Sequence, residues 1–323
     1  NQVKSTIFTR ADFVAQSRLT VPVYLDGDTP SAQALGRRFR VSGYPTMILL
    51  RPDGTEVTRL AGAVEPERYL QLLAHGLQAG RTATQAFAAA LRGEPLAAED
   101  WRLLAFYSWE TDEQQLVPRS ERASALARLA RLCPAENREA RSRLALQAVA
   151  AAGADATQGG SGAISRADAL AQAQAFVAAP ELVRAHFDLA TGAADDVVGY
   201  ATAPGTPERA RLAAAWIEAL DRLAADASLP RIGPLWAVTA KVAVLKLDAK
   251  DAALPEALLA EVRAQAARVD RETTDVNERQ SVISSASHAL AQAGLLKESD
   301  ALLEAELARS HSPYYFMLGL ASN

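Results

Sequence analysis

The sequence predicts an α+β protein of two domains, in which a small α/β domain precedes an all-α array of helical hairpins. One observation is a short apolar run, residues 47–50, that turns on Pro52-Asp53-Gly54 and returns as a strand of alternating exposure, a pattern typical of a β-hairpin. The other is the chain beyond residue 97, where alanine and leucine dominate and no alternating strand of useful length occurs.

A strand and a helix are expected ahead of the hairpin. Residues 21–26 alternate so that three aliphatic side chains share one face, as in a strand. Residues 30–40 predict an amphipathic helix that begins at Asp28-Thr29-Pro30, with a capping side chain ahead of a first-turn proline. Leu35 and Phe39 stand one turn apart and give this helix an apolar stripe for the sheet.

The hairpin and a closing helix complete the first domain. The unbroken apolar run of residues 47–50 predicts a strand covered by helices on both sides. A helix follows at residues 66–77, with acidic residues near its positive end. Its buried face is expected to consist of Tyr69, Leu70, Leu72 and Leu73.

A proline stands at the start of the first hairpin strand. Proline lacks the N–H that a strand interior needs, so Pro45 is tolerated there only as the first residue or in a turn. A cis peptide bond becomes plausible where such a proline makes a tight turn.

These elements, in this order, resemble the C-terminal two-thirds of a thioredoxin-like domain. The stretch A-x-x-L-G-x-x-F-x-V-x-G-Y-P-T at residues 32–46 carries the resemblance, together with the strand at 21–26, the P-D-G hairpin and the closing helix. It covers about the first eighty residues. It implies a thioredoxin-like α/β fold, truncated at its N-terminal side, and thiol–disulfide chemistry on protein substrates.

The resemblance also implies a substrate groove at Gly43, Tyr44, Pro45 and Thr46. Pro45 is expected to be cis and to face a Cys-x-x-Cys pair. Tyr44 is expected to present backbone groups that pair with an extended segment of the substrate, and its ring to form an apolar wall.

One departure from the family pattern governs the functional question. Thioredoxin-like oxidoreductases carry Cys-x-x-Cys before the segment that corresponds to Ile7-Phe8, whereas this chain begins at Asn1 and its one cysteine is Cys133. A dithiol cycle needs one thiol to attack and one to resolve the mixed disulfide. The chain therefore contains no catalytic dithiol. Either the motif and the opening strand lie upstream of Asn1, which we favour, or this is a redox-silent relative.

The predicted domain organisation is a thioredoxin-like domain at residues 1–79, a linker at 80–96 and a helical domain at 97–323. A tetratricopeptide-like pattern near residues 290–313 is weak, so we expect irregular helical hairpins with a flexible loop at 153–162. An apolar helix opening at 314–318 favours continuation beyond 323. The predicted helices are 97–107, 119–132, 136–152, 165–178, 181–190, 207–226, 235–247, 255–269, 276–293 and 296–310.

Composition argues against several classes of function. The chain has 34 Lys and Arg against 38 Asp and Glu, a net charge of −4, and no basic block, which argues against a nucleic-acid partner. No apolar run reaches the length of a membrane span. The four histidines lack metal-ligand spacing, and Asp26-Gly27-Asp28 is better explained as a turn and helix cap than as a cation loop. We expect no metal and no cofactor, and a buried structural role for Cys133.

Trp101, Tyr107 and Trp109 lie close together in a chain with few aromatic residues. They could form a docking surface, since Trp and Tyr are common interface anchors. Core packing between the two domains is the interpretation that we favour.

Two functions remain open from the sequence. The first is a thioredoxin-like oxidoreductase, or the larger part of one, whose helical domain binds a partner protein. The alternative is a non-catalytic thioredoxin-fold adaptor that uses the helical array for protein–protein interaction. The resemblance favours a bacterial, periplasmic location, with cytoplasm as the alternative, and the sequence leaves the partner and the oligomeric state undecided.

Overall fold

The computed structural model describes residues 7–8, 10–41, 43, 45–61, 66–110, 116–157, 164–248 and 253–309. The chain divides into two compact units, residues 1–148 and residues 149–323, and the division falls inside helix α8 (Arg138–Thr157). Across the described part of the chain, every helix is too short or too polar to span a membrane. The predicted apolar helix at 314–318 lies outside the described residues.

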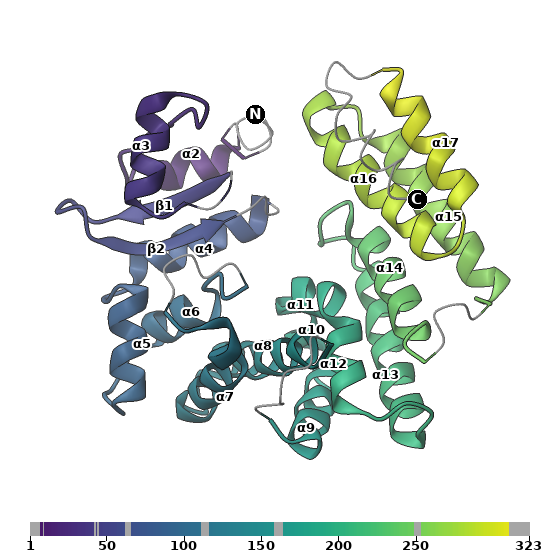
Figure 1. The fold of residues 1–323 in the computed structure, drawn as a ribbon, viewed down its shortest axis with the longest axis horizontal. Helices are drawn as coiled ribbons and strands as arrows, with labels where there is room; N and C mark the ends of the chain where they lie inside the picture. The colour runs from purple at the N-terminus through teal and green to yellow at the C-terminus, as the bar shows by residue number, and fades with distance from the viewer. Residues whose placement is uncertain are drawn as a thin grey trace. The chain divides into compact units, whose positions relative to one another are not determined.

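The sheet of the first unit is the predicted hairpin. Strands β1 (Thr46–Leu50) and β2 (Glu56–Ala61) pair antiparallel, and the described sheet has these two strands (Figure 1). Gly54 adopts φ +82° in the connecting turn, a conformation that favours glycine. The register shifts between Leu49 and Leu50, so that Val57 is an extra residue on β2, a β-bulge.

Helices cover one face of this hairpin. Helices α4 and α5 pack against β2, and α6 packs against both of these helices. Gly76 of α4 lies so close to the hairpin that a Cβ there would stand 2.6 Å from a methyl carbon of Leu49. The unit contains α2 (Ala11–Ser17), α3 (Pro30–Arg38), α4 (Pro66–Gln78), α5 (Ala83–Leu91), α6 (Ala98–Ala105), the 3-10 helix η1 (Arg119–Glu121) and α7 (Arg122–Leu132).

The prediction of a strand at residues 21–26 is wrong. The segment is irregular and exposed, and Val21 and Val23 are 88% and 75% accessible. An alternating pattern makes a strand only where a neighbouring strand accepts its backbone hydrogen bonds. The described sheet offers this segment no such neighbour. The expected stripe of α3 is likewise only half-buried at Leu35 and Phe39.

A helix occupies most of the segment expected to be a linker. Helix α5 begins with a capping box in which Thr82 accepts from Gln85 N–H and the Gln85 side chain accepts from Thr82 N–H. Gly93, at φ +74°, ends it. The glycines that suggested a linker therefore punctuate a packed helix, whose buried residues are Ala83, Ala86, Phe87, Ala89 and Ala90.

Trp101 of α6, and Tyr107 and Trp109 just after it, are buried core, as favoured from the sequence, but all three lie inside the first compact unit and not between two units. Trp101, Tyr107 and Trp109 are each no more than 3% accessible. The Trp109 ring lies 4.9 Å from that of Tyr107 and 5.8 Å from that of Phe87, and its Nε1–H donates to the Leu104 carbonyl at 2.8 Å. Because these three rings are buried, they do not form the docking surface that was the alternative interpretation.

The second unit is all helical in its described residues, as predicted. The segment predicted as one helix at 181–190 forms two short helices that meet at His186. The helices are α9 (Arg166–Val177), α10 (Pro180–Ala185), α11 (Phe187–Gly192), α12 (Ala194–Ala201), α13 (Pro207–Ala224), α14 (Gly233–Leu245), α15 (Glu256–Glu272), α16 (Val276–Gln292) and α17 (Leu296–Leu307).

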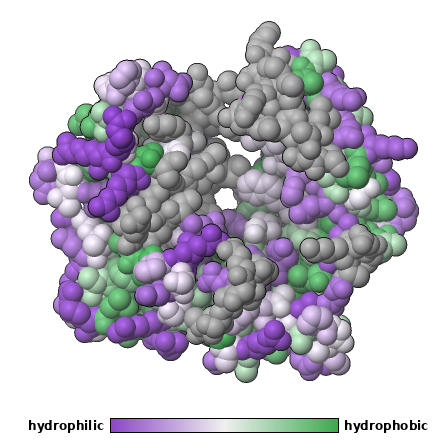
Figure 2. Space-filling view, viewed as in Figure 1, coloured by the Kyte–Doolittle hydropathy of each residue, from purple (hydrophilic) through white to green (hydrophobic). Residues whose placement is uncertain are grey.

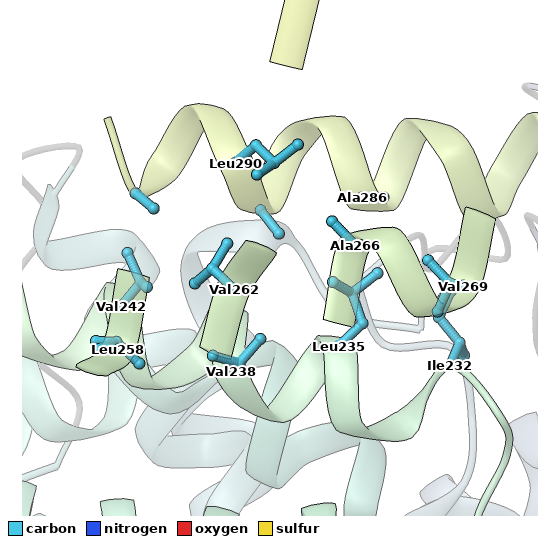
Figure 3. Close-up of a cluster of buried hydrophobic side chains, with 12 residues drawn as sticks. Ile232, Leu235, Val238, Val242, Leu258, Val262, Ala266, Val269, Ala286 and Leu290 are labelled. Atoms are coloured by element: carbon cyan, nitrogen blue, oxygen red, sulfur yellow. The ribbon is translucent and has the colours of Figure 1, made fainter. Parts of the chain in front are cut away.

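Neighbouring helices of this unit pack as hairpins around an aliphatic core. Helix α13 pairs with α14, α15 with α16, and α16 with α17, while α14 also contacts both α15 and α16. The core side chains recur every three or four residues on each helix and point toward one another between α14, α15 and α16 (Figure 3). They include Leu235, Val238, Val242, Leu258, Val262, Ala266, Val269, Ala286 and Leu290.

Buried cations link successive helices at their polar edges. Lys241 of α14 forms ion pairs with Asp221 of α13 and with Glu261 of α15, the latter at 2.8 Å. Arg279 of α16 pairs with Glu306 of α17 at 2.6 Å. The Lys241 and Arg279 side chains are 7% and 15% accessible, so loss of one partner leaves a charge with little access to water.

Gly153 corrects part of the expectation of a flexible loop at 153–162, since residues 153–157 are helical and residues 158–162 lie outside the described residues. The residue lies inside α8, which continues to Thr157. A Cβ at this position would collide with the backbone carbonyl oxygen of Asp196. The glycine therefore permits close helix packing instead of ending a helix, which its sequence context did not reveal.

Replacing Gly153 with alanine should destabilise the second unit by about 1–3 kcal/mol, because a backbone atom cannot yield as a side chain does. This cost exceeds the gain of up to about 1 kcal/mol that alanine brings to a helix. Urea unfolding followed by circular dichroism measures the change. The matched control is Gly192→Ala, where the added Cβ meets nothing within 4 Å. Equal midpoints for the two variants would contradict the packing argument.

Candidate partner-binding site

The predicted site residues lie where the chain enters β1. Gly43 and Pro45 are exposed, and a Cβ added to Gly43 would meet open space. The hydroxyl of Thr46 donates to the Gly43 carbonyl at 2.7 Å and closes the turn. Tyr44 lies outside the described residues, so its expected role stays a prediction, as does the cis isomer of Pro45.

Strand β1 has one paired edge. Its ladder runs to β2, and no other strand pairs with it among the described residues. Alternate backbone groups along the second edge of a strand point away from its neighbour and are free to bind an extended chain. The turn at Gly43–Thr46 thus leads directly into a strand edge that can accept one.

The two faces of the hairpin differ in what covers them. Met47 and Leu49 share a face, because alternate residues of a strand point the same way. They line a small cavity with residues of α4 and α6. The opposite face carries Ile48 and its partner across the ladder, Arg59.

Arg59 joins α3 to this second face. Its side chain is 3% accessible and forms a two-pronged ion pair with Glu56, with N–O distances of 2.6 and 2.7 Å. The same guanidinium donates to the backbone carbonyl of Phe39, just after α3, at 2.7 Å. Arg59 therefore fixes the end of α3 over the hairpin.

Sequence reasoning missed Arg59 for a physical reason. Residues three apart on a regular strand lie on opposite faces, so Glu56 and Arg59 gave no signal of a pair. The bulge inserts Val57 as an extra, unpaired residue in β2. Glu56 therefore opposes Leu50 and falls on the same face as Arg59. Only the register shift creates the pair.

His75 lies on the covered side, in the small cavity beneath the hairpin. Its ring centroid is 4.9 Å from that of Phe106, and its Nε2 has no hydrogen-bond partner among the described residues. Burial lowers the pKa of His75 to about 4, with smaller contributions from Arg102 and Arg143. The remaining cavity lining is Met47, Leu49, Thr58, Leu60, Leu72, Leu73 and Leu103, and Arg59 also borders the cavity although its guanidinium binds Glu56 and the Phe39 carbonyl.

Cys133 has the structural role expected of it. It follows α7, is 2% accessible, and its thiol is 3.9 Å from the Asn137 carbonyl oxygen. Burial raises the pKa of this thiol to about 12. Because the thiolate is the nucleophile, Cys133 is not an attacking residue at neutral pH.

Asp26 lies in a turn that leads into a helix cap, as interpreted from the sequence. Its carboxylate accepts from the Asp28 N–H at 3.2 Å, and its carbonyl accepts from the Thr29 hydroxyl. Thr29 in turn caps α3. Within the described residues, no three His, Cys, Asp or Glu side chains gather as metal ligands. His186 packs beside Phe176, and His311 lies outside the described residues.

One known protein family matches the start of this chain. The thioredoxin-like domain family matches residues 1–77. The N-terminal part of the chain is thioredoxin-like. Together with the all-helical region after it, this confirms the predicted fold class of a thioredoxin-like part followed by a helical array. No curated protein and no solved structure matches the chain.

The thioredoxin-like part should lose stability in mild acid through His75. Its pKa in the folded state is about 4 against an ordinary 6.5, so the unfolded chain takes up the proton first. The contribution of neutral His75 to the free energy of unfolding is complete above pH 6.5 and is lost as the pH falls from 6.5 to 4. It amounts to about 2 kcal/mol after allowance for partial exposure.

Hydrogen exchange of β1 and β2 amides over this pH range measures the effect, after correction for the intrinsic pH dependence of exchange. A His75→Leu variant should lose it, while His288→Leu, at an exposed position of α16, should keep it. An acid loss that persists in His75→Leu would assign the effect to other groups.

Proposed function

We propose that this protein binds an extended segment of a partner protein along β1, beginning at Gly43, Tyr44, Pro45 and Thr46, and acts on protein thiols as a thioredoxin-like oxidoreductase. The observation that carries the proposal is an exposed Gly43–Pro45 turn leading into a strand that has one edge without a ladder partner among the described residues. Strand addition uses backbone groups, so such an edge accepts many sequences.

The match of residues 1–77 to the thioredoxin-like family supports thiol–disulfide exchange as the chemistry. The attacking thiolate would displace one sulfur of the substrate disulfide and form a mixed disulfide, and a second thiol would then release the reduced substrate. Cys133 supplies neither thiol, because it is buried and protonated. Both thiols would therefore come from residues outside 1–323.

The burial of Cys133 also favours a second candidate, a non-catalytic adaptor. In that case the same strand edge holds the partner without reducing it. The helical unit, built from packed hairpins, would select or tether the partner in either case.

Insulin reduction by the native full-length protein discriminates the two candidates. We expect turnover in the wild type and equal turnover in Cys133→Ser, since this thiol takes no part. Mass spectrometry of the native protein identifies any further cysteine pair, and serine substitution of that pair should abolish turnover. No turnover in the wild type, or absence of further cysteines, would leave the adaptor function.

A further inference from the structure

The segment around α3 is the most one-sided in charge near the proposed site. Between Asp28 and Asp53 the chain has four arginines and no acidic residue. Arg51 donates to the Gly80 carbonyl at 2.8 Å. The other three, Arg37, Arg38 and Arg40, fall within four positions at the end of α3, and we call them the arginine cluster.

The arginine cluster is exposed, and no anionic partner binds it among the described residues. All three side chains are exposed, and none forms a hydrogen bond or ion pair through its side chain with the described residues. Arg38 alone has a contact of its own, with its guanidinium carbon 5.6 Å from the centroid of the Phe39 ring. By contrast, exposed Arg92 of the same unit is paired with Glu94 at 2.6 Å.

Helix structure explains only part of this cluster. Arg37 and Arg38 stand in the last turn of α3, where cations interact favourably with the helix dipole. Arg40 lies beyond the helix and gains much less from it. A separate reason is needed for an arginine at that position.

The backbone of Arg40 makes the residue type unexpected. The Val41 N–H bonds to the Gly36 carbonyl and the Arg40 N–H to the Arg37 carbonyl, which is a Schellman ending of the helix. Arg40 takes φ +54°, the position where glycine is preferred. The other described residues with positive φ are all glycines: Gly54, Gly93, Gly205 and Gly294. Arg40 thus holds a strained conformation that glycine would relieve, as residues at binding sites often do.

Arg59 sets where the arginine cluster lies. It binds the Phe39 carbonyl at 2.7 Å and pairs with Ile48 across the ladder, so the end of α3 is held at the middle of β1. Helix α3 lies beside β1 in the ribbon view (Figure 1). Strongly hydrophilic side chains gather over this part of the surface (Figure 2). The chain then runs from Arg40 through Gly43 into β1.

We propose that the arginine cluster binds acidic side chains of the segment that lies along β1, so that the preferred partner is an acidic, extended protein segment. This inference rests on the proposed function and names its substrate class. Arginine is the residue best suited to bind carboxylates, through its planar fork of donors. A polynucleotide fits less well, because the chain carries a net charge of −4 and its charge excess is acidic.

The test uses two fluorescent decapeptides that differ in one residue type, alternating Thr-Glu and alternating Thr-Gln, with the native full-length protein. Fluorescence anisotropy should show about tenfold tighter binding of the Glu peptide, a preference that high salt removes. Arg40→Gly should weaken Glu-peptide binding about fivefold while binding of the Gln peptide stays unchanged. Its urea midpoint should rise, because glycine relieves the strain, so lost binding cannot be ascribed to lost folding.

Arg92→Gln is the matched control and should bind both peptides as the wild type does. Equal affinity for the two peptides, with protection of β1 amides in hydrogen exchange, would overturn acid selection and leave the strand site intact. No binding of either peptide would overturn the proposed function as well. Glu-peptide binding that leaves the β1 amides unprotected, tighter binding of single-stranded DNA, or self-association lost in Arg40→Gly would each overturn the acidic-segment assignment.

Discussion

The contact of Arg59 with Glu56 and Phe39 is the interaction on which the candidate site depends. Helix α3 has little other attachment to the sheet, since Leu35 and Phe39 are only half-buried and the residue buried within the helix is Ala32. Hydrophobic packing alone would therefore hold this helix weakly. A buried guanidinium with both prongs on a carboxylate and a further bond to a backbone carbonyl supplies the missing specificity.

In the second unit, ion pairs of largely buried cations likewise join neighbouring helices. Lys241 links three successive helices, and Arg279 joins α16 to α17. Arg209 is held by the Thr202 carbonyl and hydroxyl and by Asp248. Such pairs contribute little net stability, but they are costly to break, so they favour one arrangement of helices over near alternatives. The apolar core drives association, and the cations select the register.

The parts of the fold that could be predicted are those set by local sequence. The Pro52-Asp53-Gly54 turn determines the hairpin, and apolar spacing determines α13 to α17, because both signals lie within a few residues. The strand expected at 21–26 failed because pairing depends on a distant neighbour. Gly153 was misjudged because the carbonyl that requires it lies on another helix.

The candidate site was predictable to a similar degree. Gly43, Pro45 and Thr46 were named from the resemblance to the thioredoxin-like family, and their role in binding stays a prediction. Arg59 could not be, because the bulge at Val57 places Glu56 on its face and no local pattern marks a bulge there.

Hydrogen exchange at the end of α3 tests the central claim most directly. The Val41 amide, bonded to the Gly36 carbonyl, reports whether this helix end is held in place. In Arg59→Met, which keeps the length of the side chain and removes its donors, this amide should exchange about tenfold faster or more than in the wild type. Amides of α13 and α14 should not change. An unchanged rate at Val41 in this variant would show that Arg59 does not hold α3 on the hairpin.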